Sequence, residues 1–176
     1  RRELLSVLTD QLHEARIGRT GLSLVYADLD GFKEVNDSYG HEIGDLLLKA
    51  VAAGFAHLAQ DMGLVARLGG DEFAIIVTGE DSTARSRELA NNMISFLSEP
   101  MIFGGRVASV SVSVGIVDLE KDDADVEEII RRADVAMYAA KSAGRNRLHI
   151  YDKTLDYKRD ENRSIARALR EHIDMG

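Results

Sequence analysis

The stretch LGGDEF, residues 68–73, places two glycines directly before two carboxylates. Short apolar runs flank it, LVA at 64–66 and FAIIVT at 73–78, and such runs are typical of strands. Glycine pairs are common in β-hairpins because glycine reaches positive φ at little cost. The sequence therefore predicts a hairpin that turns over Gly69 to Glu72. Taken alone, the motif indicates no more than a solvated turn that carries acids.

The composition indicates one globular domain. The chain has 176 residues, of which 45% are hydrophobic and one is proline, and this length is enough to bury a core. The net charge of −8 argues against broad binding to nucleic acid or to an anionic membrane. A nucleotide is still compatible with this charge, because metal ions can neutralise its phosphates locally.

The sequence also limits the cellular setting. Cysteine is absent, which excludes disulfides and thiolate metal sites and is compatible with a reducing compartment. No apolar run approaches the roughly 20 residues that span a bilayer, and no signal peptide is visible. The first residues, RRELL, lack a methionine, so we expect a piece of a longer protein. We expect a cytoplasmic domain, although the full-length protein could be membrane-tethered.

Helices and strands alternate along the chain without long linkers. Apolar spacing predicts helices over 3–17, 44–62, 82–99 and 125–144, with Pro100 ending the third and Gly144 as the C′ residue of the fourth. A buried strand is predicted over 22–30, a turn over 31–40, a hairpin over 101–117 that turns at Gly104-Gly105, and a last strand over 145–152. A charged terminal helix is predicted over 153–173.

Two acidic stretches stand out in this arrangement. Asp28 and Asp30 lie at the carboxyl end of the first strand, and Asp71 and Glu72 lie in the hairpin turn. If the two strands are neighbours in the sheet, these acids converge at one edge. Hard cations such as Mg²⁺ take carboxylate and carbonyl oxygens, with substrate phosphates completing the shell. The alternative is that Asp30 caps a turn and the other acids are solvated, and an isolated D-x-D favours this alternative.

The stretch DLDGFKEVNDSYGHEIGD, residues 28–45, adds polar groups suited to a nucleotide. Lys33 can hold a phosphate as a point charge, while Asn36 and Asp45 together can read a guanine edge. The plainer interpretations are a solvated lysine, an asparagine in a turn and an aspartate near the positive end of a helix. Near the other end of the chain, Lys141 and Arg145 are either a second phosphate clamp or cations at a helix C-terminus.

Four motifs together resemble the GGDEF domain of diguanylate cyclases: D-x-D-x-F-K-x-x-N-D-x-x-G-H-x-x-G-D, R-L-G-G-D-E-F, S-V-G and A-D-x-A-M-Y-x-A-K-x-x-G-R-N. The likeness covers residues 1–150, and residues 151–176 are similar to the helix that links such domains to a following EAL phosphodiesterase domain. The resemblance implies an α+β sandwich whose central, mostly antiparallel sheet is flanked by helices, as in nucleotidyl cyclases and the polymerase palm. It also implies the condensation of two GTP molecules to cyclic di-GMP with release of pyrophosphate.

The resemblance assigns a role to each matching residue. Asp28, the carbonyl of Leu29 and Asp71 match the ligands of Mg²⁺ or Mn²⁺. Asp71 also matches the proposed base for the ribose 3′-hydroxyl, and Glu72 matches the neighbouring essential acid, with the division between them left open. The remaining matches are Lys33 as transition-state stabiliser, Asn36 and Asp45 as guanine readers, His41 as a further substrate contact, and Lys141 and Arg145 as holders of the terminal phosphates.

One departure from the family pattern concerns regulation. Many members carry an RxxD product-inhibition site upstream of the hairpin, and here Gln60 and Gly63 occupy the positions of its arginine and aspartate. Gln60 lacks the charged fork of arginine, and Gly63 has no side chain. We therefore expect no feedback by cyclic di-GMP through this site.

Two functions are compatible with these residues. In the first, the domain is an active cyclase that needs a second GGDEF domain facing it, since each domain holds one GTP. In the second, it is a regulatory module that binds GTP and controls an attached EAL phosphodiesterase. The intact acids favour the first function, and the linker-like tail keeps the second open. Sensory domains are further expected partners, and nucleic acid is not.

Overall fold

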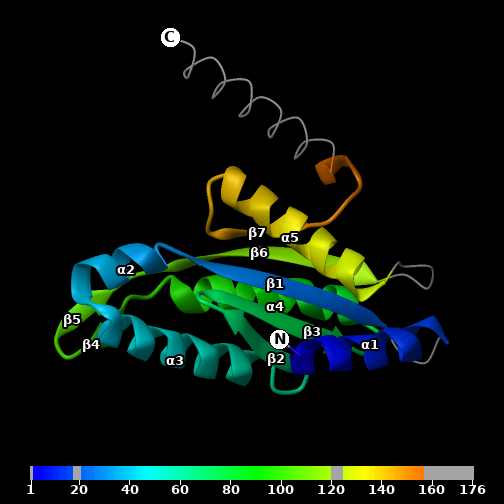
Figure 1. Ribbon diagram of the computed structural model, residues 1–176, viewed down its shortest axis with the longest axis horizontal. Coiled ribbons are helices and arrows are strands. Elements are labelled where there is room, and N and C mark those ends of the chain that lie inside the picture. Colours follow the sequence, from blue (N-terminus) through cyan, green and yellow to red (C-terminus); the bar gives the residue numbers. More distant parts are fainter. Residues whose placement is uncertain (1, 18–20, 120–124, 157–176) are drawn as a thin grey trace, which may run out of the picture.

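The computed structural model describes residues 2–17, 21–119 and 125–156. In this part of the chain a five-stranded sheet has the order β2-β3-β1-β6-β7 (Figure 1). The strands are β1 (Leu22–Asp30), β2 (Gly63–Gly69), β3 (Glu72–Thr78), β6 (Ser111–Leu119) and β7 (Arg147–Ile150). Only the β6–β7 pair is parallel within this sheet. The predicted α+β fold with a central, mostly antiparallel sheet is confirmed.

Helices cover both faces of the sheet because its central strands are apolar on both sides (Figure 1). One face packs against α1 (Arg2–Arg16) and α5 (Val126–Ser142), which contribute Leu4, Leu8 and Met137 among others. The opposite face packs against α2 (Phe32–Tyr39), α3 (His41–Leu58) and α4 (Ser82–Leu97). Among the helices of the described residues, none is long and apolar enough to cross a membrane.

The central strand β1 is buried along its whole length, as predicted. Its odd residues, such as Val25, contact the cluster beneath α3 and α4, and its even residues, such as Leu24, contact the cluster beneath α1 and α5. This alternation follows from the two-residue period of a strand. β3 pairs with one side of β1 and β6 with the other, so the end of β1 is fixed from both sides.

The predicted turn over 31–40 is wrong, because most of it forms the helix α2. The backbone leaves helical geometry only at the two glycines that flank this helix, Gly31 with φ 83° and Gly40 with φ 84°. Val35 is buried between them, and Phe32 and Tyr39 pack against the same core, so this short segment has an apolar side to cover. The turn-forming residues of this stretch conceal its apolar spacing, and the next helix begins at His41 rather than at the predicted residue 44.

The predicted hairpin over 101–117 is only partly confirmed. β4 (Met101–Phe103) and β5 (Arg106–Ala108) pair and turn at Gly104-Gly105, as expected. The remainder leaves this hairpin at Ser109 and enters the main sheet as β6. β6 is buried from Val112 to Val117, and this burial accounts for its place beside β1. The predicted terminal helix lies outside the described residues beyond residue 156.

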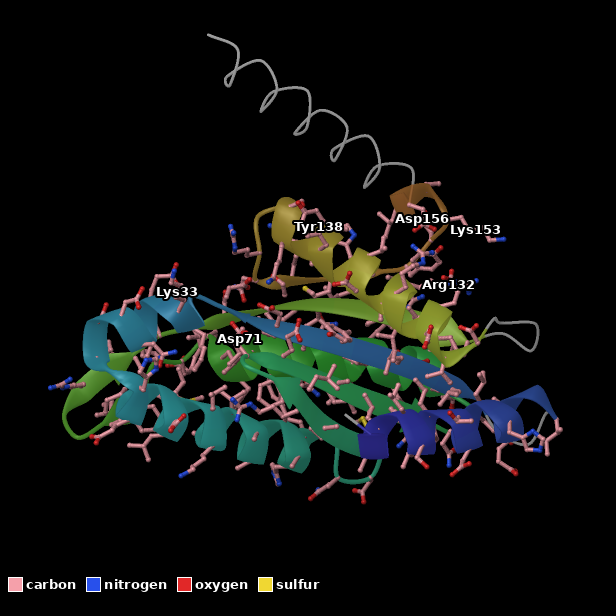
Figure 2. The ribbon with its side chains drawn as sticks, in the orientation of Figure 1. Lys33, Asp71, Arg132, Tyr138, Lys153 and Asp156 are labelled. Carbon is pink, nitrogen blue, oxygen red and sulfur yellow. The ribbon has the colours of Figure 1, made fainter. Side chains whose placement is uncertain are left out.

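The segment after β7 is held against α5 by charged and aromatic contacts. The Arg131 guanidinium lies 2.6 Å from Glu128 Oε2 and 2.7 Å from Asp156 Oδ1, so one cation joins the helix to the segment. The Tyr151 hydroxyl donates to Asp156 at 2.6 Å, and buried Leu155 packs against the same helix. Figure 2 shows Arg132 and Asp156 at this end of the molecule. The hydrogen bond to Arg131 lowers the pKa of Glu128 to about 2.

We predict that Glu128→Gln destabilises the protein in a pH-dependent way. The pKa of this carboxyl is about 2 in the folded protein against an ordinary 4.5, so its ionised form stabilises the fold above pH 4.5. That contribution is lost as the pH falls from 4.5 towards 2. Because the pair is partly exposed, we expect a loss of up to about 1 kcal/mol at pH 7. Urea denaturation at several pH values measures it.

The matched control is Glu127→Gln, which changes the neighbouring exposed residue in the same first turn of α5. Its effect on the free energy of unfolding should be close to zero. A loss in Glu128→Gln that stays constant between pH 7 and pH 3.5 would contradict the proposed ion pair.

Candidate functional site

Strand register brings the two acidic stretches together. β1 pairs with β3 so that Asp28 lies opposite Glu72, and the Leu29 N–H donates to the Asp71 carbonyl at 3.2 Å. Asp28 is only 9% exposed, so its carboxylate lies largely out of solvent. The sequence predicted that these acids would converge if the strands were neighbours, and the pairing confirms that condition. Figure 2 shows Asp71 near the end of β1 that leads into α2.

The acids that meet here repel one another, and this repulsion contributes to the raised pKa values of Asp28 and Glu72. Burial raises the pKa of Asp28, and the nearby charges of Asp71 and Asp30 raise it further, while Lys141 opposes them. Burial likewise raises the pKa of Glu72, helped by Asp28 and Asp71. Neighbouring carboxylates therefore repel one another here, and a cation between them would relieve this repulsion.

One cation of the chain already contacts the acids. Lys141 Nζ lies 2.7 Å from Asp28 Oδ1, with 28% of the lysine side chain exposed. Lys141 comes from the last turn of α5, so this ion pair joins that helix to the end of β1. The pairing brings a sequence-predicted phosphate binder and a sequence-predicted metal ligand into direct contact.

The acids fit a divalent cation that is shared with a substrate. Within the described residues, no three His, Cys, Asp or Glu side chains are grouped closely enough to hold a metal ion by themselves. Asp28, Asp71 and the Leu29 carbonyl offer oxygen ligands only, the type that Mg²⁺ and Mn²⁺ take together with substrate phosphates and water. The repulsion among the acids and their oxygen chemistry favour such a shared ion over a closed protein site.

The predicted base-reading residues lie on α2 and α3. Asn36 is half-buried on α2, and a Cβ placed on Gly44 would come within 2.0 Å of its Oδ1. The absence of a side chain at Gly44 therefore leaves the space that the Asn36 amide occupies. Asp45 and His41 lie exposed on the first turns of α3, where they can meet a ligand. Lys33 is exposed on the first turn of α2 (Figure 2).

A Schellman motif ends α5 and begins a tight turn. The Gly144 N–H donates to the Lys141 carbonyl at 3.3 Å, and the Arg145 N–H donates to the Ala140 carbonyl at 3.1 Å. Gly144 has φ 114°, which confirms its predicted place as the C′ residue. Arg145 and Asn146 follow with φ 60° and 48°, a left-handed conformation that residues with a side chain rarely adopt.

Asp30 has a part in this arrangement that local sequence did not indicate. Its carboxylate accepts hydrogen bonds from Ser111 Oγ at 3.0 Å, from Ser113 Oγ at 2.8 Å and from the Asn146 N–H at 3.2 Å. Arg145 Nε lies 3.8 Å from the same group. Asp30 therefore does not cap a turn on its own strand. Serines at alternate positions of β6 are a signal that could have indicated a polar partner on the neighbouring strand.

Comparison with known proteins identifies the family. The family model for "Diguanylate cyclase, GGDEF domain" matches residues 1–147. The chain belongs to the GGDEF-domain family. The GGDEF domain of YfiN from Pseudomonas aeruginosa has a TM-score of 0.86 with this structure and 30% identity, covering 91% of this chain and 94% of that one. An active GGEEF domain of a diguanylate cyclase from Vibrio cholerae has a TM-score of 0.79 and 32% identity, covering 87% and 97%.

Curated relatives of this GGDEF domain are much longer proteins. MucR of P. aeruginosa, a bifunctional diguanylate cyclase/cyclic di-GMP phosphodiesterase, is 34% identical over 152 residues, which are 86% of this chain and 22% of MucR. NbdA of the same organism, a cyclic di-GMP phosphodiesterase, is 31% identical over 168 residues, which are 95% of this chain and 21% of NbdA. The chain therefore spans about a fifth of these relatives, and they include proteins named for opposite reactions.

The geometry around Gly63 bears on product inhibition in this GGDEF domain. A Cβ on Gly63 would lie 1.6 Å from the Ile76 carbonyl oxygen of the paired strand β3, so the backbone leaves no room for an aspartate. Gln60 is exposed and follows the end of α3. The absence of inhibition through these positions stays a prediction, and the close approach of β2 to β3 adds a steric reason for it.

We predict that the wild-type monomer does not bind cyclic di-GMP at Gln60 and Gly63. We also predict that restoring arginine and aspartate at these two positions does not create a binding site in a stable protein. Gly63→Asp should lower the free energy of unfolding by roughly 1–3 kcal/mol, because the clash is with backbone that cannot move freely. Gln60→Arg alone is the control and should leave stability unchanged, since that side chain is exposed. Calorimetric titration of cyclic di-GMP and urea denaturation test both statements. Tight binding to a Gln60→Arg/Gly63→Asp variant of native stability would contradict them.

Proposed function

We propose that this GGDEF domain is a diguanylate cyclase that condenses two GTP molecules into cyclic di-GMP with release of pyrophosphate. The observation that carries the proposal is the register of β1 and β3, which sets Asp28 beside Asp71 and Glu72 with Lys141 in contact. The acids and one cation thus meet at one end of the sheet, and the proposed base-reading residues lie on α2 and α3, which follow that end of β1 in the chain. The name of the family and the active V. cholerae domain support this choice of reaction. We place the reaction in the cytoplasm, where GTP is available.

The chemistry requires a hydroxyl of one nucleotide to attack the phosphorus of another. The 3′-oxygen of one GTP forms a bond to the α-phosphorus of the second, the bond to the β-phosphate breaks, and pyrophosphate leaves. The proton of the 3′-hydroxyl passes to a carboxylate, for which Asp71 and Glu72 are the candidates. The raised pKa of Glu72 makes its carboxylate a stronger proton acceptor than an ordinary one.

Asp28, Asp71 and the Leu29 carbonyl would hold the Mg²⁺ or Mn²⁺ ions. Such ions, when bound, lower the pKa of the attacking hydroxyl and stabilise charge on the phosphates. The protein's own cations would complete the phosphate site: Lys33 lies in the first turn of α2, Lys141 in the last turn of α5, and Arg145 in the turn that follows α5. Lys141 contacts Asp28 and Arg145 lies near Asp30, both at the carboxyl end of β1, and Lys33 follows that end in the chain. The phosphates would then lie between opposite charges.

Each site holds one nucleotide in this proposal, so two domains must face each other. A single set of acids lies at one end of the described sheet, and cyclic di-GMP needs two bonds formed between two nucleotides. A homodimer supplies the second set. Guanine would be read by Asn36 and Asp45, with His41 as a further contact on the first turn of α3.

A second candidate function follows from the relatives. NbdA carries the name of a phosphodiesterase although it shares this domain at 31% identity. A domain that binds GTP without turnover could control an attached EAL phosphodiesterase, and residues 151–176 would then form the predicted linker. The active function is preferred because the acids, the cations and Asn36 are all present.

The proposal predicts that a forced dimer makes cyclic di-GMP from GTP and Mg²⁺. Fusion of a parallel coiled coil to the N-terminus brings two domains together, and chromatography measures the product. Asp28→Asn should lower the rate by about 100-fold or more, because charge stabilisation at the phosphates is lost. The control is Asp81→Asn at the N-cap of α4, an exposed residue whose side chain makes no capping hydrogen bond.

The outcomes separate the two candidates. Product from wild type and Asp81→Asn, with little from Asp28→Asn, supports the cyclase. GTP binding without product in the wild-type dimer supports the regulatory module instead. Undiminished product from Asp28→Asn would remove Asp28 from the site.

Gly44 touches no ligand in this proposal, but it leaves the space for the Asn36 amide, so a substitution there should affect guanine binding. In Gly44→Ala the new Cβ displaces the Asn36 amide, so we expect the affinity for GTP to fall about tenfold and the preference over ATP to shrink. Stability should change little, because the displaced atom is the end of a side chain and alanine favours a helix by about 1 kcal/mol. Calorimetric titration with GTP and ATP measures the effect.

Gly54→Ala on the same helix is the matched control. Its Cβ would meet the Phe96 ring at 2.3 Å, so it changes packing far from Asn36 and should leave GTP affinity unchanged. Equal affinity of the wild type for ATP and GTP would contradict the assignment of Asn36 and Asp45.

A further inference from the structure

Asp30 is the most fully bonded carboxylate near the candidate site, and the proposed reaction gives it no task. Its side chain is 5% exposed, and hydroxyls of Ser111 and Ser113 hold it from the neighbouring strand β6. Two hydroxyl donors of the neighbouring strand therefore hold this carboxylate in place independently of the turn after α5. A fixed, buried negative charge at the end of β1 is a suitable anchor for mobile cationic or N–H groups.

The group that Asp30 anchors is the left-handed turn after α5. The Asn146 N–H donates to Asp30 Oδ2 at 3.2 Å, and Arg145 Nε lies 3.8 Å from Oδ1. Arg145 and Asn146 both have positive φ, and such a pair persists only where the surroundings determine it. On the helix side, the Schellman hydrogen bonds fix the turn, and on the sheet side Asp30 does so.

We propose that Asp30 is a positioning residue that sets this turn and thereby places Lys141 and Arg145 for the terminal phosphates of the nucleotide. The inference rests on the proposed function. Lys141 lies one turn before the anchored residues and contacts Asp28, so a displaced turn moves both cations relative to the acids. Asp30 itself touches no substrate atom in this proposal.

Different residues hold the terminal phosphates and the base in this proposal. Lys141 and Arg145 serve the terminal phosphates, whereas the base is read on α2 and α3 at the far side of β1. Loss of Asp30 should therefore weaken binding of GTP much more than binding of GMP, which has no terminal phosphates. A general loss of structure would weaken both nucleotides alike.

The test is Asp30→Asn in the 176-residue chain, with GTP and GMP titrated calorimetrically under the same Mg²⁺ concentration. The amide replaces one acceptor oxygen by a donor, so it cannot receive all of the same hydrogen bonds. We expect GTP affinity to fall about tenfold and GMP affinity to change less than twofold. Hydrogen exchange of the Asn146 amide should become faster, which reports the loosened turn without any nucleotide.

Asp118→Asn is the matched control on the same two strands. Asp118 accepts a hydrogen bond from Ser23 Oγ at 2.9 Å across the other end of the β1–β6 pair. Like Asp30, Asp118 accepts a hydrogen bond from a serine hydroxyl across the β1–β6 pair, but it lies away from the turn after α5. We expect its GTP-to-GMP affinity ratio and the exchange of the Asn146 amide to match the wild type.

A second variant covers the case in which Asp30→Asn does not fold. Ser113→Ala removes one donor to the carboxylate and keeps its charge, so it should give a smaller loss in the same direction, again for GTP alone. Equal losses for GTP and GMP in the folded variants would overturn the positioning role, and so would unchanged affinity for both. A wild-type dimer that binds GTP without making product would overturn the cyclase function, while the ratio of affinities still tests Asp30.

Discussion

The structure depends on the pairing of β1 with β3 on one side and β6 on the other. This pairing buries β1 completely and fixes its last residues, Asp28 to Asp30, against two different partners. β3 supplies Glu72 opposite Asp28, and β6 supplies the serines that hold Asp30. Because side chains alternate along a strand, a shift of one residue would turn both carboxylates to the opposite face of the sheet. The candidate site therefore depends on the same register as the core.

Electrostatic balance is the second constraint at this end of the sheet. Carboxylates gather there, and burial together with repulsion from neighbouring carboxylates raises the pKa values of Asp28 and Glu72. The ion pair of Lys141 with Asp28 offsets part of this repulsion. Lys141 lies in the last turn of α5 and Arg145 in the turn that follows it, and the Asn146 N–H of that turn donates to Asp30. The cations and the acids of the site are therefore connected through Asp30. A site that gathers like charges in this way is suited to a ligand that brings cations and phosphates together.

Much of the architecture follows from local sequence. Apolar runs determine β1, β3 and β6, the glycines of the LGGDEF stretch determine the hairpin, and Gly144 determines the end of α5. The family motifs select the acids and the cations, because their order and separations are specific. Local signals failed at α2, where Asn36 and the glycines at its two ends are typical of a turn. There the burial of Val35 against the sheet outweighs the turn preference, and burial is not a local property.

The sequence by itself determined most of the strands, the family and the residue types of the site. Only the tertiary structure decided how they meet: Asp28 with Lys141 over 113 positions of separation, and Asp30 with the N–H of Asn146 over 116. Strand order and register set these contacts, and they arise from packing on both faces of the sheet at once. The role of Gly44 is of the same kind, since its missing side chain matters only because Asn36 lies against it. Contacts between distant segments depend on the whole core, which is why no local pattern indicated them.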